Sequence, residues 1–266
     1  MHAPLKVLVV AAHGSSHPLA RAALGGFADH VRALAPDRPI HLAYTAFRRS
    51  GNHPASAGAQ ERELPRVLEG LERLGAPVEL AVLSLHVVAG DEFERTRLAV
   101  EAFARGQGVP ARLSGPLLAR PEDAPQVARA LAGELKALPP GEAAVLMGHG
   151  AAGEAQQLYR ELARELQALA PLARLGVLEA ADPADPLHIR AMAADLAARG
   201  VRRATLAPLL TVAGRHAHKD LAGEQPGSWR SALAAHGIDS PADLRGLVER
   251  EAFRALWAGR LAGLLA

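Results

Sequence analysis

The chain has 266 residues, of which 49% are hydrophobic and 22% charged, with a formal net charge of +2 and no cysteine. This composition is typical of a globular protein with room for one large domain or two smaller ones. The absence of cysteine excludes disulfides, thiolate nucleophiles and iron–sulfur clusters, so a metal ion would have to be held by His, Asp or Glu.

Two classes of partner are also disfavoured. Aromatic residues make up only 3% of the chain, and the sequence has no long run of Lys and Arg, so we expect no nucleic-acid partner. No apolar run approaches the roughly 18 residues of a membrane span, so we expect no membrane partner. Residues 1–12 fit a buried strand better than a signal peptide, and we therefore expect a cytoplasmic protein.

In the first half of the chain, short apolar runs alternate with helical patterns. Residues 6–12 (KVLVVAA) form a nearly continuous apolar run that ends at a Gly turn, which is typical of a buried parallel strand. The same criteria predict further strands at 40–44, 78–86 and 111–117, helices at 19–34, 62–74, 91–104 and 121–137, and a loop at 50–58.

The pattern starts again after Pro139-Pro140. Strands are predicted at 143–147, 175–179 and 202–209, and helices at 154–169, at 184–199 and from 228 onward, with a short edge strand between 238 and 247. Residues 211–226 are rich in His and Gly and are predicted to form a long loop.

This alternation predicts an α/β fold in which parallel sheets carry helices on both faces. A single β/α barrel is the main alternative. Two similar lobes are favoured because LVVAAHGSS resembles AVLMGHGAA and HVVAGDEFE resembles LTVAGRHAH. The paired segments are 136 residues apart (His13 to His149) and 124 apart (Gly90 to Gly214). We expect lobes at 1–138 and 139–266, with a cleft between them at the C-terminal ends of their strands.

Four histidines fall at predicted strand ends, namely His13, His86, His149 and His216, and His218 follows the last of them. If residues 216–218 are extended, His216 and His218 share a face. Each histidine alone could equally occupy an ordinary turn or surface loop.

Glu179 ends the apolar strand LGVLE, where a buried carboxylate would require a cation or hydrogen bonds. A solvated strand end is the alternative interpretation of Glu179. Together, His149, Glu179 and His216 offer two imidazoles and one carboxylate, a ligand set suited to Co²⁺, Fe²⁺, Ni²⁺ or Zn²⁺. Neither a phosphate-binding P-loop, nor G-x-G-x-x-G after a strand, nor a G-x-S-x-G elbow is present.

Four segments are similar to a known family: SLHVVAGDEFE (84–94), VLMGHG (145–150), VLEA (177–180) and PLLTVAGRHAHKDLAGEQPGSWRSALAAHG (208–237). They resemble the anaerobic sirohydrochlorin cobaltochelatases, class II tetrapyrrole chelatases whose superfamily includes the ferrochelatases. The resemblance covers nearly the whole chain, and the last segment is the most specific. It implies two α/β lobes and the insertion of Co²⁺ into sirohydrochlorin in cobalamin biosynthesis.

The resemblance also implies that the metal is held by His149, Glu179 and His216. The His13-Gly14-Ser15 turn departs from the Phe-Gly-Thr of many relatives and is closer to that of single-lobe chelatases, in which an N-terminal His binds metal. We therefore expect His13 and His86 to form a second pair, vestigial or facing the substrate.

A mechanism follows from these assignments. His149 and His216 would bind the ion and accept pyrrole protons, because imidazole titrates near neutral pH, and Glu179 would offset the charge. The repeat matches Glu92 with His216 and predicts that Glu92 is a proton acceptor or a partner of another site residue.

Several arginines could bind the acidic substrate that the resemblance implies. Arg48, Arg49 and Arg215 are candidates for binding substrate carboxylates, although each could be an ordinary surface charge. We expect no permanently bound cofactor, with Co²⁺ as the substrate metal and Fe²⁺ or Ni²⁺ as alternatives. The rival functions are a ferrochelatase acting on sirohydrochlorin or a porphyrin, and a non-catalytic protein that binds metal or tetrapyrrole. A homo-oligomer is left open.

Overall fold

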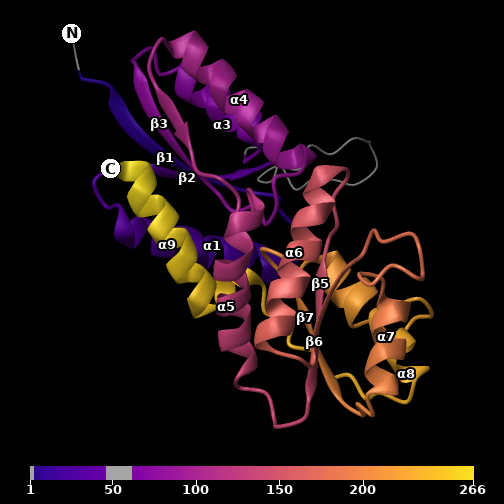
Figure 1. Cartoon of the computed structure of the whole chain (residues 1–266). Coiled ribbons are helices and arrows are strands. Elements are labelled where there is room, and N and C mark those ends of the chain that lie inside the picture. The colour runs from indigo at the N-terminus through magenta and orange to yellow at the C-terminus, as the bar shows by residue number, and fades with distance from the viewer. Residues whose placement is uncertain (1–2, 46–61) are drawn as a thin grey trace. The chain divides into compact units, whose positions relative to one another are not determined.

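The structure, a computed structural model, describes residues 3–45 and 62–266. Parallel strands alternate with helices in the order the apolar runs predict, and the contacts between residues separate two compact units (Figure 1). We call residues up to Leu117 together with Ala255–Ala266 unit 1, and Leu118–Arg254 unit 2.

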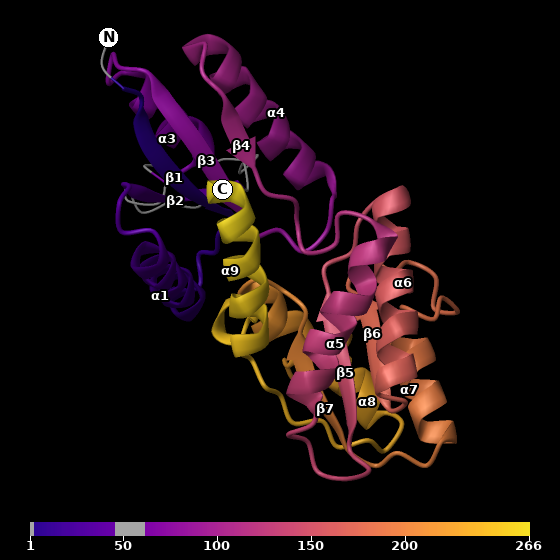
Figure 2. The same ribbon diagram turned by 60° about the vertical axis from the view of Figure 1, so that its left-hand side comes forward.

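Unit 1 is built on a four-stranded parallel sheet with the order β2-β1-β3-β4. Its strands are β1 (Leu5–Ala12), β2 (Ile40–Tyr44), β3 (Val78–Ser84) and β4 (Ala111–Leu113), and its helices include α1 (Pro18–Leu34), α3 (Leu64–Glu72) and α4 (Asp91–Gln107). Helix α4 lies along β3 and β4 (Figure 2). It begins with acidic residues in its first turn, which the helix dipole favours, and ends where Gly108 adopts a left-handed conformation.

The core of unit 1 explains why β1 is a continuous apolar run. Val7 and Val9 of this strand belong to one buried cluster with Leu68 of α3 and Phe103 of α4. The intervening residues of β1, such as Leu8, are also fully buried. A strand in the middle of a parallel sheet has both faces covered, so its alternation of apolar and polar residues is lost.

The C-terminal residues complete unit 1. The rings of Phe27 in α1 and Trp257 in helix α9 (Glu251–Leu265) pack edge to face with their centroids 5.4 Å apart. The guanidinium of Arg260 donates hydrogen bonds to the carbonyl oxygens of Gly115 and Leu117. These contacts hold the last turns of α9 to α1 and to the segment that follows β4, both in unit 1.

Unit 2 has a parallel sheet with the order β6-β5-β7. Its strands are β5 (Ala143–Gly148), β6 (Ala173–Val177) and β7 (Ala204–Pro208), and its helices are α5 (Ala124–Leu135), α6 (Glu154–Leu169), α7 (Ile189–Ala198) and α8 (Trp229–Ala234). Met192 of α7 and Leu233 of α8 share a buried cluster with Met147 of β5. Helices α5 and α6 pack side by side on the other side of the sheet (Figure 1).

The edge strand predicted between 238 and 247 is not formed as a strand. The segment makes isolated parallel bridges, Arg203 with Asp239 and Leu206 with Ala242. Pro241 lies between the bridges and has no N–H to give to a ladder, which explains the interruption. The part of this sheet that the structure describes therefore has three strands rather than four.

The units divide the chain differently from the lobes predicted at 1–138 and 139–266. The boundary lies at Leu117–Leu118, because α5 packs against α6 and so joins the second sheet. The final residues, Ala255–Ala266, return to the first unit. Hydrophobic periodicity indicates that a helix exists, but it does not indicate which sheet the helix covers.

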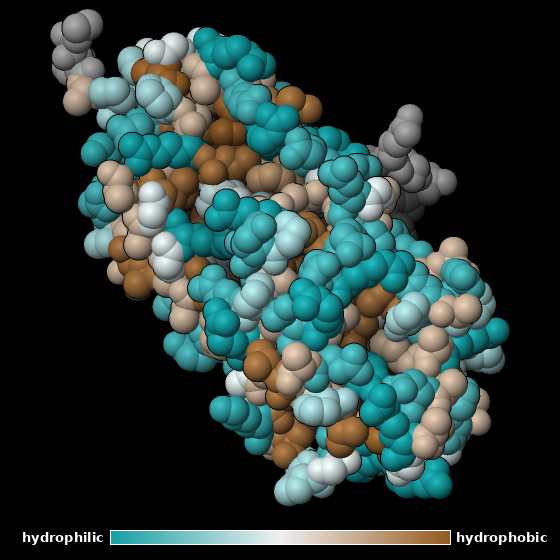
Figure 3. All heavy atoms as spheres, viewed as in Figure 1, coloured by the Kyte–Doolittle hydropathy of each residue, from teal (hydrophilic) through white to brown (hydrophobic). Residues whose placement is uncertain are grey.

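The surface agrees with the composition. Polar residues cover most of the face shown in Figure 3, with apolar residues in smaller groups between them. Among the helices of residues 3–45 and 62–266, none is both long enough and apolar enough to cross a bilayer.

Candidate metal site

The turn after β5 presents His149 between two glycines that the local packing requires. A Cβ on Gly148 would lie 2.6 Å from Cε1 of Tyr159, and one on Gly150 would lie 2.9 Å from Cβ of Glu179. Gly150 also has a φ of +108°, which L side chains rarely adopt. The glycines therefore let the backbone of His149 approach α6 on one side and Glu179 on the other.

Tyr159 of α6 is the buried support of this turn. Its phenol takes part in hydrogen bonds with the backbone of Gly150 and His149. Burial raises the pKa of Tyr159 to about 12 in spite of these hydrogen bonds. The phenol is therefore neutral near neutral pH and serves as structure rather than as a base.

Glu179 follows β6 and is tied to the same turn. Its backbone N–H donates to the carbonyl of His149 at 3.1 Å, and the preceding N–H of Leu178 donates to Gly148 at 3.0 Å. One carboxylate oxygen, Oε1, lies 3.4 Å from Nδ1 of His149. The side chains of His149 and Glu179 are 43% and 56% exposed, so an ion arriving from solvent can reach both.

His216 follows β7 and completes the group predicted from the sequence. Its ring lies edge-on to that of His149, with the ring centroids 5.2 Å apart. Its Nδ1 lies 2.7 Å from Oδ2 of Asp220, which is the hydrogen bond that fixes one tautomer of a metal-binding histidine. With the proton assigned to Nδ1, Nε2 is the ring nitrogen that has a lone pair to offer to a metal.

The segment predicted as a loop at 211–226 is helical around His216. Residues 215–216 are helical and Ala217–Leu221 form a π-turn. In helical geometry two residues two positions apart point in different directions, and because the segment is not extended, the condition under which His216 and His218 would share a face is not met. The helical turn instead brings Asp220, four residues on, to the ring of His216. π-turns often occur at functional sites.

The three side chains of unit 2 are gathered but do not form a closed cage. In residues 3–45 and 62–266, no group of three or more His, Cys, Asp or Glu side chains could hold a metal ion as it stands. His149, Glu179 and His216 would have to shift around an arriving ion. Such an open arrangement suits an ion that must leave again, and their role as ligands stays a prediction.

Unit 1 has a second polar cluster at the corresponding strand ends. Nδ1 of His13 lies 2.5 Å from Oε2 of Glu92, the second residue of α4. The Thr45 hydroxyl donates to Oε1 of Glu92 and lies 3.0 Å from Nε2 of His86. Nδ1 of His86 lies 2.8 Å from the hydroxyl of Ser84. The structure therefore joins His13 and His86 through one carboxylate.

These contacts set the charges of the cluster. Burial opposes ionisation of Glu92, but the hydrogen bonds and charges of His13 and His86 outweigh it and hold the pKa of Glu92 well below its ordinary 4.5. The hydrogen bond and the charge of Glu92 raise the pKa of His13 above 6.5, and they outweigh the partial loss of solvent around its ring. His13 and Glu92 thus form an ion pair.

The predicted carboxylate-binding arginines are only partly described. Arg48 and Arg49 lie outside the described residues. Arg215 is exposed and directly precedes His216 on the same helical turn. Sequence reasoning missed Asp220, Tyr159, Thr45 and Ser84. Only Asp220 carried a usable signal, its spacing of four residues from His216, and that signal depends on recognising a helix in a segment predicted as a loop.

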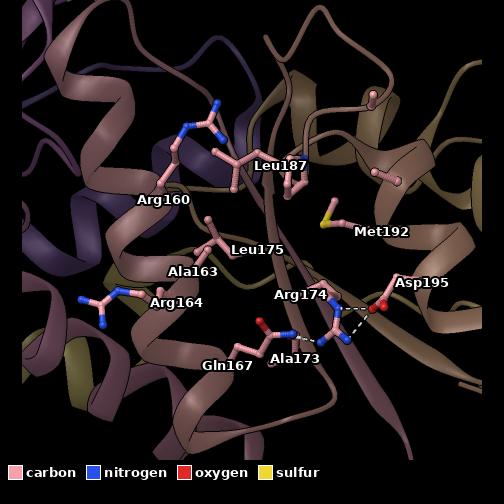
Figure 4. A pocket seen from close by; sticks show the side chains of 13 residues that line it. Arg160, Ala163, Arg164, Gln167, Ala173, Arg174, Leu175, Leu187, Met192 and Asp195 are labelled. Carbon is pink, nitrogen blue, oxygen red and sulfur yellow. Dashed lines mark hydrogen bonds and ion pairs between the residues drawn. The ribbon is translucent and has the colours of Figure 1, made fainter.

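A pocket elsewhere in unit 2 does not belong to this chemistry. It lies between α6, β6 and α7 and is lined by apolar residues such as Leu175 and Met192 together with arginines (Figure 4). Arg174 is paired with Asp195 through hydrogen bonds to Oδ2. Because Arg160 is paired with Asp185, the charges at this pocket are largely neutralised by their neighbours.

Solved chelatases that act in tetrapyrrole biosynthesis share this fold. SirB from Bacillus subtilis, solved with Fe³⁺, superposes with a TM-score of 0.67 at 16% identity, covering 98% of this chain and 96% of that one. CbiX, described as the terminal enzyme for biosynthesis of sirohaem in denitrifying bacteria, gives a TM-score of 0.58 at 23% identity, covering 98% and 100%. These identities are low, so the likeness concerns the fold.

The chain belongs to the CbiK cobalt chelatase family, whose model matches residues 6–265. Sirohydrochlorin cobaltochelatase CbiKC of Nitratidesulfovibrio vulgaris (strain Hildenborough) is 34% identical over 98% of this chain and 91% of the relative. The sirohydrochlorin cobaltochelatase of Salmonella typhimurium (strain LT2) is 30% identical over 96% and 95%. The family resemblance and the prediction of a metal chelatase are confirmed.

Proposed function

We propose that this chelatase inserts Co²⁺ into sirohydrochlorin in cobalamin biosynthesis, using His149, Glu179 and His216 to hold the arriving ion. The family and the names of its curated relatives support the reaction. The observation that carries the site is the meeting of these three exposed side chains at the ends of β5, β6 and β7. Two imidazoles and a carboxylate suit a divalent ion of the cobalt type.

The reaction exchanges an ion for protons. Sirohydrochlorin loses two pyrrole protons as Co²⁺ enters the ring, so the protein must release a cation and take up protons at one place. An imidazole that has given up its metal regains the lone pair that accepts a proton. His149 and His216 can therefore pass the ion to the ring nitrogens and receive the ring protons in its place.

Glu179 and Asp220 act on charge and orientation. Glu179 offsets the charge of the ion beside His149, 3.4 Å away. Asp220 holds the proton on Nδ1 of His216 so that Nε2 faces the metal. Tyr159 supports the backbone of His149 and takes no part in proton transfer, because its pKa of about 12 keeps it neutral.

The test is an absorbance assay of the macrocycle with Co²⁺, in the wild type and in the His149→Ala, Glu179→Gln and His216→Ala variants. Each variant should lose on the order of 10- to 100-fold or more in rate, since removing even an outer hydrogen-bonding partner of a metal ligand costs that much. His236→Ala is the matched control, because its Nδ1 contacts only the carbonyl of Ala232, at 3.1 Å, among the contacts described.

The outcomes separate the alternatives. A wild type no faster than the spontaneous reaction with Co²⁺, but active with Fe²⁺, would make the protein a ferrochelatase. Tight binding of the ring without metallation would indicate a binding protein. The cytoplasmic location, the lack of a permanently bound cofactor and the lack of nucleic-acid and membrane partners stay predictions.

A further inference from the structure

The polar cluster of unit 1 contains more buried groups than a simple ion pair needs. Ser84 and Thr45 have no exposed surface and His86 is 8% exposed. These three side chains lie behind Glu92, which is 21% exposed, whereas His13, in front of it, is 60% exposed. Buried polar side chains are costly unless each is hydrogen-bonded, so their arrangement calls for an account.

The hydrogen bonds run in one direction, toward Glu92. The Thr45 hydroxyl has a single hydrogen, which it donates to Oε1 of Glu92. Its oxygen can then only accept from His86, so Nε2 of His86, 3.0 Å away, carries a hydrogen. The Ser84 hydroxyl occupies the other ring nitrogen at 2.8 Å and fixes the ring.

Glu92 therefore receives donors on both oxygens. Thr45 donates to Oε1, and Nε2 of His86 lies 3.5 Å from the same oxygen. Nδ1 of His13 is hydrogen-bonded to Oε2 at 2.5 Å. Glu92 also lies in the first turn of α4, where the helix dipole favours a negative charge. A carboxylate satisfied in this way is a poor proton acceptor.

The turn that carries His13 is held in place as well. Gly14 has a φ of +86°, and a Cβ there would lie 2.9 Å from Cγ of Tyr44. The backbone after β1 is thus packed closely against the end of β2. Among the described residues, the titratable groups in contact with Glu92 are His13, after β1, and His86, after β3 on the buried side.

We propose that Thr45 and His86 position Glu92 as a fixed anion whose role is to keep His13 protonated, so that His13 donates a hydrogen bond to a carboxylate of the tetrapyrrole. Of the two roles predicted for Glu92, this is the partner and not the proton acceptor. A protonated imidazole has no lone pair for a metal, so His13 is not a metal ligand. The choice of substrate carboxylate rests on the proposed function; the arrangement around Glu92 does not.

The arrangement is tested by NMR titration of the histidine rings in the full-length protein without metal or macrocycle. His13 is assigned by its loss in His13→Gln, and His236 serves as the internal reference. We expect His13 to titrate above 6.5 in the wild type and at or below 6.5 in Glu92→Gln. Thr45→Val should lower the pKa of His13, and Thr45→Ser should restore it.

Two results would overturn this part. One is a His13 that titrates at or below 6.5 in the wild type, a result that does not depend on whether any variant folds. The other is a His13 whose pKa is the same in Glu92→Gln and in the wild type. Because His236 lies in unit 2, outside the cluster, its ring signals should have the same chemical shifts at any given pH in all these proteins, and a change there would reveal a general loss of structure.

The substrate contact is tested by kinetics with sirohydrochlorin and Co²⁺. His13→Gln should raise the KM for sirohydrochlorin about tenfold, the size expected for one charged hydrogen bond, with a much smaller effect on kcat. His13→Arg keeps a cation and should recover most of the loss. Titration with Co²⁺ alone should give the same affinity in all three proteins.

A loss of Co²⁺ affinity in His13→Gln would make His13 a metal ligand and overturn the proposal. An unchanged KM would overturn the substrate contact while leaving the NMR result to decide the role of Glu92. A wild type without chelatase activity would defeat the proposed function instead, and the titration of His13 would still stand or fall by itself.

Discussion

The two units place similar turns after their central strands but equip them differently. His13 follows β1 and His149 follows β5. The sequence repeat matches Glu92 of unit 1 with His216 of unit 2. In unit 2 the rings of His149 and His216 lie edge-on with their centroids 5.2 Å apart, whereas in unit 1 Nδ1 of His13 is hydrogen-bonded to Oε2 of Glu92 at 2.5 Å. One exchange of His for Glu thus separates an open pair of imidazoles from a closed ion pair.

The supports differ in the same sense. Ser84 pairs with Ala11 in the register of unit 1, and Pro208 pairs with Met147 at the corresponding place in unit 2. A hydroxyl behind the cluster can fix a buried histidine, and a proline cannot. In unit 2 the fixing group comes instead from Asp220 on the helical turn of His216. In unit 1 a histidine of the cluster is therefore held by a buried hydroxyl of the strand, and in unit 2 His216 is held by a carboxylate of its own helical turn.

The largest effect is expected from a substitution of Gly148, the glycine that lets the turn of unit 2 pack against Tyr159. Gly148→Ala places a methyl group 2.6 Å from Cε1 of Tyr159, so either the ring or the turn must move. We expect a loss of about 1–3 kcal/mol in the free energy of unfolding. Chelatase activity should fall by about 100-fold, because His149 moves with the turn.

The measurements are urea unfolding and the absorbance assay. Gly263→Ala is the matched control, since it lies in α9, has an ordinary φ and has nothing within 4 Å of the added Cβ. Wild-type activity in Gly148→Ala would show that the turn can relax and that its glycine is not what positions His149.

A smaller effect is expected at Asp220. Asp220→Asn removes the negative charge that holds the proton on Nδ1 of His216, 2.7 Å away. Affinity for Co²⁺ should fall about tenfold or somewhat more, as it does for other outer partners of metal-binding histidines. Direct titration with Co²⁺ measures this, with Glu224→Gln, an acidic residue nearby in the sequence, as the control. Equal affinities of Asp220→Asn and the wild type would remove Asp220 from the site.

The smallest effect concerns the stability of the ion pair in unit 1 as pH changes. The folded pKa of His13 is raised, so its contribution is complete below 6.5 and is lost as pH rises through the raised value. The folded pKa of Glu92 is lowered, so its contribution is complete above 4.5 and is lost as pH falls through the lowered value. The pair therefore stabilises the fold most between pH 4.5 and pH 6.5, where both contributions are complete.

Thermal unfolding of the wild type and His13→Gln measures this contribution. The difference in Tm should be greatest at a pH between 4.5 and 6.5 and should shrink at alkaline pH. It should amount to no more than a few degrees, because the His13 side chain is 60% exposed and solvent screens the pair. A difference that grows toward alkaline pH would contradict the ion pair.

Much of the fold was accessible from the sequence because buried parallel strands leave long apolar runs. The run at 6–12 became β1, and the histidines after such runs came together at strand ends as expected. Periodicity could not show that α5 covers the second sheet or that residues 255–266 complete the first. An apolar helix face can pack on either sheet, and only the folded chain shows which sheet it covers. The same limit applies to the bridges at 239 and 242, which Pro241 keeps from becoming a strand.

The candidate site was predictable only for residues whose side chains are typical metal ligands. His149, Glu179 and His216 stood out because imidazoles and a carboxylate after apolar strands are unusual. Thr45 and Ser84 are ordinary residues whose role arises entirely from their hydrogen bonds to His86 and Glu92. Asp220 was hidden because Gly and His around it suggested a loop, whereas its contact with His216 depends on a helical turn.

The division of the chain has a consequence for how the protein is made. Unit 2 is continuous, whereas unit 1 needs Ala255–Ala266, including Trp257, whose ring packs on Phe27. Unit 1 therefore cannot complete its core until these last residues are available, although its sheet is synthesised first. Until they pack, the apolar surface around Phe27 is uncovered, and exposed apolar surface of this kind favours aggregation of a folding chain.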